Sequence, residues 1–158
     1  MSEAKFLELL KENQGIIFKL VGLYATDNEE KKDLYQEVLL NAWKSWPSYK
    51  GEAKFSTWLY RLCLNTIFTQ KRKSRPIEYS DSLEHIAPSV ENIAIKQADS
   101  QRLWQAIRLL SEADRAIISM NLDGFDNAEI GQTMGITLNH VSVKLHRIKD
   151  QLAKLLKN

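Results

Sequence analysis

The sequence predicts an all-α protein with two small helical domains joined by a flexible linker, the second of which contains a helix-turn-helix. Only three prolines and six glycines occur among 158 residues, whereas the helix-favouring Leu, Ile, Lys and Glu are abundant. Apolar residues recur at spacings of three and four, and no stretch alternates convincingly like a β-strand. The helical periodicity stops between Arg75 and about Val90, where Pro, Ser and acidic residues are typical of a linker. We therefore expect domains at residues 1–76 and 92–158, with a linker at residues 77–91.

The composition, 44% hydrophobic and 27% charged, is that of a globular protein. The N-terminus lacks the apolar core of a signal peptide, and no apolar run approaches the ~20 residues that a membrane span requires. The only cysteine, Cys63, has no partner for a disulfide or a metal cage, and its place on an apolar stripe predicts a packed side chain. These features predict a cytoplasmic protein without membrane insertion.

The three histidines, His85, His140 and His146, do not mark a recognisable active site. None of them has a nucleophile or a group of carboxylates around it at a known spacing. We therefore expect no enzyme activity, no cofactor and no metal ion in this chain.

Charge is distributed unevenly along the chain, although the net charge is only +2. Residues 77–100 carry five acids against one lysine, a balance of −4, whereas residues 137–158 carry five basic residues against one acid, a balance of +4. A basic end is one property expected of a nucleic-acid-binding segment.

The first half of the N-terminal domain should form two or three helices. Apolar residues from Phe6 to Leu23 indicate one helix, or a pair broken near Gly15, and Asp27 or Asn28 can cap the helix that follows. That helix, residues 29–46, has a core stripe: Leu34, Tyr35, Val38, Leu39, Ala42 and Trp46. Its opposite side carries an ordered, mostly polar set: Asp33, Gln36, Glu37, Leu40, Asn41 and Lys44. Periodicity alone does not decide whether that set binds a partner or is an ordinary solvated face.

The next predicted helix begins at Phe55 and ends before Pro76, with Ser56 or Thr57 as its cap. Its apolar stripe contains Trp58, Leu59, Leu62, Cys63, Thr66 and Ile67. Another side holds Thr57, Arg61, Asn65, Phe68 and Arg72, and the end is strongly basic with Lys71, Arg72, Lys73 and Arg75. Such a run can follow phosphates, although taken alone it is more often a core helix with a solvated basic tail.

The loop before this helix contains a ring and two cations, Tyr49, Lys50 and Lys54, that are able to meet a nucleic acid. The simpler interpretation of Tyr49 is that its ring packs against Trp46.

The second domain carries the most specific pattern in the chain. Ser111 and Asp126 are each followed three residues later by an acid and can cap helices, and Gly124 ends the first of these. Gly135 suits a left-handed helix end, and Thr137 can cap a further helix two residues later. This is the arrangement of a helix-turn-helix.

Gly131 lacks a side chain where these two helices should approach each other, and an apolar seam accompanies it: Ile130, Ile136, Val141, Leu145 and Ile148. The second helix and its cap then offer groups able to bond phosphates and base edges in a major groove: Thr137, Asn139, His140, Ser142, Val143, Lys144 and Arg147. The alternative is a plain helical hairpin.

Nearly the whole sequence resembles a bacterial RNA polymerase sigma factor of the small extracytoplasmic-function group. EEKKDLYQEVLLNAWKSWPSY is similar to the helix that binds core polymerase, and KFSTWLYRLCLNTIFTQKRK to the helix that melts and reads the minus-ten element. The segment from Leu110 to Leu152 is similar to the domain that reads the minus-thirty-five element. Leu64, Thr69 and the pair Ser142-Val143 depart from residues common in this group, which puts any inherited promoter sequence in doubt.

The resemblance implies roles for particular residues. The surface that meets polymerase would include Asp33, Gln36, Glu37, Asn41 and Trp43, and the promoter-melting helix would use Trp58, Arg61 and Asn65. Core RNA polymerase and promoter DNA, both duplex and melted, are the implied partners, and an anti-sigma factor is a candidate that the sequence neither requires nor excludes. A stand-alone helix-turn-helix regulator is the alternative function, but it leaves the basic, aromatic-bearing helix of the first domain unexplained.

Overall fold

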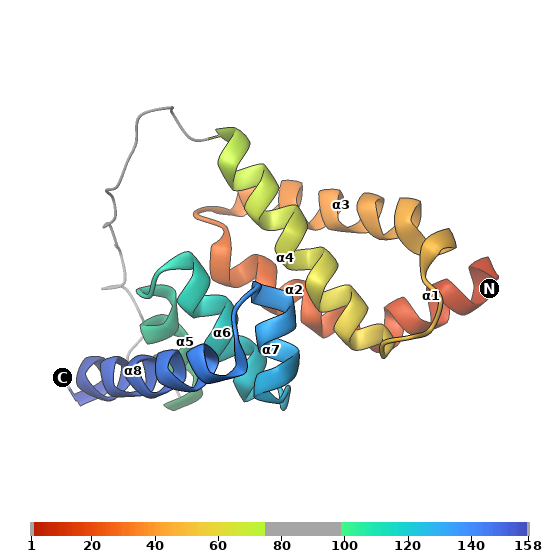
Figure 1. Cartoon of the computed structure of the whole chain (residues 1–158). Coiled ribbons are helices and arrows are strands. Elements are labelled where there is room, and N and C mark those ends of the chain that lie inside the picture. Colours follow the sequence, from red (N-terminus) through yellow and green to blue (C-terminus); the bar gives the residue numbers. More distant parts are fainter. Residues whose placement is uncertain (1, 75–98, 158) are drawn as a thin grey trace. The chain divides into compact units, whose positions relative to one another are not determined.

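The computed structural model describes residues 2–74 and 99–157, which belong to two compact units, Met1–Glu78 and Tyr79–Asn158 (Figure 1). Every regular element in these described residues is a helix. The predicted all-α class with two helical parts is therefore confirmed. The predicted linker, residues 77–91, lies outside the described residues, and the exact domain boundaries stay predictions.

The described residues of unit 1 form four α-helices and one short 3-10 helix: α1 (Glu3–Glu12), α2 (Gln14–Tyr24), α3 (Asn28–Ser45), η1 (Trp46–Ser48) and α4 (Phe55–Ser74). Of the two alternatives that the sequence left open, one helix or a pair broken near Gly15, the structure has the pair, and the break lies at Asn13. The Asn13 backbone N–H bonds the carbonyls of Leu9 and Leu10, and its side-chain amide donates to the Leu9 carbonyl at 2.8 Å. These bonds satisfy carbonyls that the end of α1 leaves without helical partners.

Helix α4 packs against both α2 and α3, so more than one of its faces is buried (Figure 1). Tyr60 and Leu64 are as deeply buried as Leu59 and Cys63, although they lie outside the single stripe that periodicity predicted. Thr57, expected on the polar side, is only 5% exposed. A stripe pattern underestimates the burial of a helix that has two neighbours.

The predicted cap of α4 is wrong. The helix begins at Phe55, and the Lys54 carbonyl already accepts the Trp58 N–H at 3.0 Å. Ser56 and Thr57 therefore lie inside the first turn.

Unit 2 contains α5 (Asp99–Arg108), α6 (Glu112–Leu122), α7 (Asn127–Met134) and α8 (Leu138–Lys157). Its core draws apolar side chains from these helices and, with Leu110, from the turn after α5: Ile107, Leu110, Ile117, Met120, Ile130, Val141, Leu145, Ile148 and Leu152. Within the described residues, no helix of either unit is long and apolar enough to cross a membrane.

The predicted caps of unit 2 are confirmed. The Ser111 hydroxyl accepts from the Asp114 N–H, and Asp126 and Glu129 form a reciprocal capping box at the start of α7. Gly135 ends α7 with φ at 75°, in the left-handed region that favours glycine. The Thr137 hydroxyl then accepts the His140 N–H at 3.1 Å at the start of α8. Helix, short turn and helix follow as the sequence predicted.

Candidate functional site

Helix α3 presents a stripe of outward-facing side chains at spacings of three and four residues. Asp33, Gln36, Leu40, Trp43 and Lys44 are exposed on this stripe, which we call the α3 stripe; Glu37 is half-buried beside them. The spacing places these side chains along one side of the helix. Apart from Asn41, the face that periodicity predicted is therefore present at the surface, together with Trp43, which only the resemblance implied.

Two large apolar side chains interrupt the polar groups of the α3 stripe. Leu40 is 46% exposed and Trp43 is 45% exposed. The indole of Trp43 also contacts the buried Phe6 ring edge-on, at a centroid distance of 5.6 Å. This contact fixes one side of the indole and leaves the remainder at the surface, which is an arrangement suited to protein recognition.

The sequence predicted a free Asn41 side chain on the α3 stripe, but the structure shows otherwise. The Asn41 amide Nδ2 donates to the buried Thr66 hydroxyl of α4 at 3.0 Å. The bond satisfies a buried polar side chain and ties α3 to α4, so the structure gives Asn41 a role in packing.

Tyr49 is half-buried in an aromatic cluster. Its ring stacks on Trp46 at 5.6 Å between centroids and lies 5.2 Å from Trp58, and its hydroxyl donates to the Ala53 carbonyl at 2.6 Å. Trp46 Nε1 has no hydrogen-bond partner among the described residues. The structure shows the simpler interpretation of Tyr49, packing against Trp46. The hydrogen bond from its hydroxyl to Ala53 also joins two parts of the loop.

The other predicted nucleic-acid residues of unit 1 differ in accessibility. Lys50 and Lys54 are exposed on the loop, and Asn65, Arg72 and Lys73 are exposed on α4. Arg61 is half-buried and interacts with other groups of the protein. Exposed amide and cationic groups therefore extend from the loop along α4 to its basic end.

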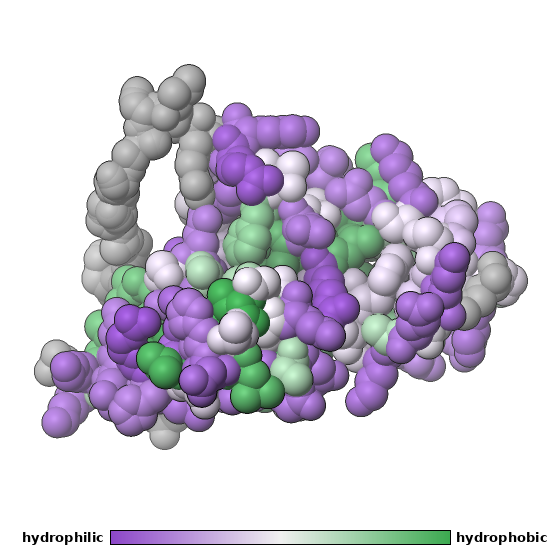
Figure 2. Space-filling model, viewed as in Figure 1, coloured by the Kyte–Doolittle hydropathy of each residue, from purple (hydrophilic) through white to green (hydrophobic). Residues whose placement is uncertain are grey.

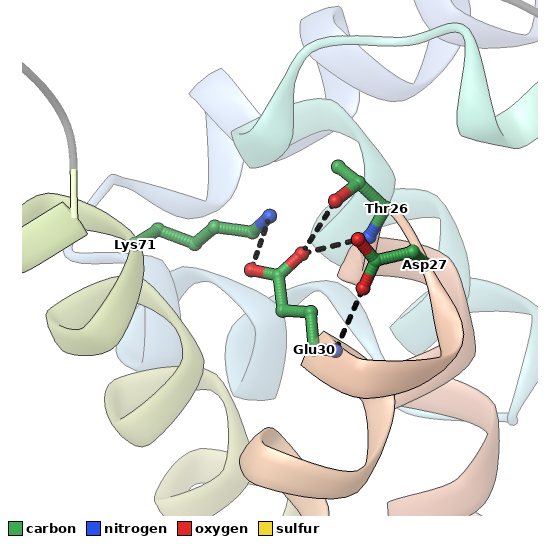
Figure 3. Close-up of polar contacts among 4 residues, drawn as sticks. All are labelled: Thr26, Asp27, Glu30 and Lys71. Atoms are coloured by element: carbon green, nitrogen blue, oxygen red, sulfur yellow. Dashed lines mark hydrogen bonds and ion pairs between the residues drawn. The ribbon is translucent and has the colours of Figure 1, made fainter.

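Lys71 is held by a carboxylate of another helix (Figure 3). Its Nζ lies 3.0 Å from Oε2 of Glu30 on α3, and Oε1 of the same carboxylate accepts the backbone N–H and hydroxyl of Thr26. Burial raises the pKa of the Glu30 carboxyl, but the hydrogen bonds from Thr26 and Lys71 together lower it more, so the net pKa lies below its ordinary value. Lys71 therefore joins α4 to the start of α3, a role that the basic run did not reveal.

Helix α8 of unit 2 presents most of the predicted DNA-binding groups to solvent. Asn139, His140, Ser142, Val143 and Arg147 are all exposed. The side of the molecule shown in Figure 2 is mostly hydrophilic over unit 2, with small hydrophobic areas between. A helix with amide, hydroxyl and guanidinium groups on its open face can contact both phosphates and base edges.

Lys144 is the exception on α8. It is half-buried, and its Nζ lies 3.4 Å from Oδ1 of Asp114 in the first turn of α6. Nothing in the local sequence signals this pair, because the two residues are 30 positions apart. The ion pair lowers the positive charge available on this part of α8.

No group of three or more His, Cys, Asp or Glu side chains that could hold a metal ion occurs among the described residues. His140 and His146 are exposed on α8, and His85 lies outside the described residues. Cys63 is fully buried, and burial raises the pKa of its thiol to about 12. Its predicted role as a packed side chain is confirmed.

Two family models match the chain, one over each unit. Residues 9–77 match Sigma-70 region 2, and residues 100–152 match Sigma-70 region 4. The chain belongs to the sigma-70 family. Its curated relatives place it in the extracytoplasmic-function (ECF) group, and sigma factors act as transcription initiation factors that bind DNA.

Two of these relatives illustrate how far the similarity extends. ECF RNA polymerase sigma factor SigW of Bacillus subtilis is 26% identical, over 97% of this chain and 89% of its own. ECF RNA polymerase sigma-E factor of Escherichia coli is 25% identical, over 91% and 82%. The similarity of this ECF factor to its relatives therefore spans both units.

Solved structures show the same fold. The sigma factor RpoE of Bartonella quintana, in complex with the anti-sigma factor NepR, is similar with a TM-score of 0.74 and 21% identity, and the match covers 97% of each chain. CnrH, in complex with the cytosolic domain of CnrY, gives a TM-score of 0.70 and 16% identity, with 99% of this chain and 90% of that chain covered.

Proposed function

We propose that this ECF factor binds core RNA polymerase and directs it to promoters, opening the DNA with unit 1 and reading the upstream element with unit 2. One observation carries the proposal: two different surfaces occur in one chain, in the order of sigma-70 regions 2 and 4. Unit 1 carries a polar and basic surface, and unit 2 carries the helix-turn-helix. Either unit alone would support a less specific role.

The α3 stripe is the proposed polymerase-binding surface. It combines exposed acidic and amide groups with the partly fixed ring of Trp43. Burial of Leu40 and Trp43 against a partner would supply affinity, and the acids would select a basic surface. Asn41 is left out of this surface because its amide is bonded to Thr66.

Charge reversal tests this surface. The double substitution Asp33→Lys and Glu37→Lys should weaken assembly with core polymerase while helicity and the melting temperature change little. Glu8→Lys with Glu12→Lys is the control, because these two acids are also four residues apart on a helix of unit 1; both are exposed. Equal assembly of both double variants, in a titration of labelled protein with core polymerase, would remove the α3 stripe from the proposal.

Promoter opening requires binding energy that only a single strand can supply. Extrusion of one base costs a few kcal/mol of stacking and pairing, which hydrogen bonds and stacking in a protein site can offset. Lys50, Lys54 and Asn65 are exposed on the loop and on α4, and Arg61 lies on the same helix. We assign them to the unpaired strand of the minus-ten element, with Arg72 and Lys73 on the flanking backbone.

Tyr49 has a different place in this proposal from the one its sequence position suggested. Its ring is already stacked on Trp46, and its hydroxyl holds the Ala53 carbonyl. We therefore assign it to the shape of the loop that presents Lys50 and Lys54.

Permanganate footprinting of unpaired thymines tests the opening step. Arg61→Ala with Asn65→Ala should abolish open-complex formation on a duplex promoter while assembly with core polymerase is retained. A template with a pre-melted bubble should recover part of the transcription, because the opening cost is already met. If the double variant opens the duplex at the parent rate, these residues do not act in melting.

The same assays separate the proposal from a stand-alone helix-turn-helix regulator. A regulator would bind a duplex site tightly without polymerase, and the charge reversals on α3 would not affect it. The two similar solved structures each contain a second protein. A protein that covers the proposed surfaces, such as an anti-sigma factor, is therefore a candidate partner of this chain.

A further inference from the structure

Val143 lies at the centre of the open face of α8. The buried seam of this helix is formed by Val141, Leu145, Ile148 and Leu152. At 3.6 residues per turn, Val143 is rotated by roughly 170° from the middle of that seam. Val143 is 59% exposed, and the structure shows no packing role for it.

The neighbours of Val143 on this face are polar. Asn139 precedes it by four residues and Arg147 follows it by four, which places one above and one below it on the helix surface. Ser142 is adjacent and exposed. A β-branched residue is also a poorer helix former than the unbranched residues that suit such a position, so helix stability does not explain it.

A single apolar side chain among hydrogen-bonding groups matches one feature of duplex DNA. In the major groove, the C5-methyl of thymine is the apolar group that base edges present, and the other bases present donors and acceptors. Amide and guanidinium groups on either side of Val143 can pair with adjacent bases or phosphates.

We propose that Val143 is a specificity-determining residue that contacts the C5-methyl of a thymine in the upstream element. This inference rests on the proposed function, because it requires α8 to enter the major groove. Beyond the proposed function, it specifies that one base of the upstream element is a thymine and that Val143 contacts the methyl group of this base.

The first step of the test is to find the element. Holoenzyme reconstituted with the full chain is used to select binding sequences from duplexes randomised in the upstream region. Each thymine of the enriched element, on both strands, is then replaced singly by deoxyuridine, which removes the methyl group and keeps the pairing. We expect one such replacement to weaken binding roughly fourfold, the factor that corresponds to burial of one methyl group.

The second step assigns that methyl group to Val143. Val143→Ala should reduce the thymine-to-uracil affinity ratio at that position to about one, with the fold kept because alanine is the better helix former. Leu155→Ala is the matched control: it also shortens an exposed apolar side chain of α8, about 18 Å along the helix from Val143. This control should leave the ratio unchanged.

The outcomes separate the inference from the function on which it rests. If the holoenzyme enriches no upstream sequence, the proposed function fails and the inference fails with it. If an element is enriched but no uracil replacement matters, or Val143→Ala keeps the full ratio, then only the assignment of Val143 is overturned.

Discussion

Substitution of Gly131 by alanine tests how closely the turn of the helix-turn-helix is packed. A Cβ atom at this position would lie 2.6 Å from the Ile136 backbone carbonyl oxygen and 3.5 Å from Val141 Cγ2. The first distance is far inside van der Waals contact, and the obstacle is backbone that cannot rotate away. The Gly131 carbonyl also accepts the N–H groups of Gly135 and Ile136, at 2.8 and 3.0 Å, so a shift of the turn strains these bonds as well.

Two opposing effects set the size of the change. Alanine is favoured over glycine inside a helix by roughly 0.5–1 kcal/mol, whereas overpacking in a tight site costs typically about 1–3 kcal/mol. The steric cost should win at Gly131 because the near atom is main chain, and unit 2 should lose about 1–2 kcal/mol of its free energy of unfolding. For a domain of this size, that loss corresponds to a melting temperature lower by roughly 5–15 °C.

Gly22→Ala is the matched control. Gly22 also lies inside a helix, α2 of unit 1, but a Cβ atom there would meet nothing within 4 Å. Only the helix-propensity effect remains, so this variant should stabilise unit 1 by about 0.5–1 kcal/mol.

Native-state hydrogen exchange of the full chain measures both effects, because the slowest amides of each unit report its own free energy of opening. Gly131→Ala should accelerate exchange in α7 and α8, and Gly22→Ala should slow it in α2. Below its melting temperature, the Gly131 variant should also bind the upstream element more weakly, because the turn that sets the angle of α8 has moved. Exchange in unit 2 that is as slow as in the parent would refute the close approach on which this reasoning depends.

Three further outcomes follow from the charged and buried groups. Because the pKa of the Glu30 carboxyl is lower in the folded protein, Glu30 contributes stability at a pH above the ordinary pKa of 4.5, and this contribution is lost as the pH falls through the folded pKa. Glu30→Gln should therefore make the melting temperature of unit 1 less dependent on acid pH. The Cys63 thiol, buried and with its pKa raised to about 12, should not react with a thiol reagent at pH 8 in the native protein and should react fully in urea; rapid native labelling would contradict its burial. Asp114→Asn should free Lys144, so that log affinity for duplex DNA falls more steeply with log salt, by about 0.9 if the lysine reaches a phosphate; an unchanged slope would show that it does not.

Local signals made unit 2 predictable from sequence. The capping residues Ser111, Asp126 and Thr137, and the left-handed Gly135, act over three or four residues, so each could be read without knowledge of the tertiary structure. Unit 1 has fewer such signals around α4. Helix α4 packs against both α2 and α3, and a single apolar stripe does not report the burial of Tyr60.

The candidate surfaces were predicted as faces, but the state of individual side chains within them was not. Helical spacing alone predicted the exposed α3 stripe except for Trp43, which the resemblance implied. The bond from Asn41 to Thr66 joins residues 25 positions apart, and the stacking of Tyr49 on Trp46 depends on how the loop folds. Long-range pairing such as that of Asn41 with Thr66 has no periodic signature, so this partner was not predicted. Trp46, three residues before Tyr49, was the partner that the simpler interpretation of Tyr49 named.

The same limitation applies to charge, and it changes how the DNA-facing surface is counted. Lys71 and Lys144 each belong to a basic segment, yet Glu30 and Asp114, carboxylates on other helices, hold both of them half-buried. A lysine held in this way contributes to DNA affinity only if it leaves its carboxylate partner. The loss of that ion pair then offsets part of the binding free energy that a phosphate contact supplies. Exposed cations such as Arg147 have no such cost. The salt dependence of binding should therefore reflect the exposed cations, and be weaker than the number of Lys and Arg residues in the two basic segments would suggest.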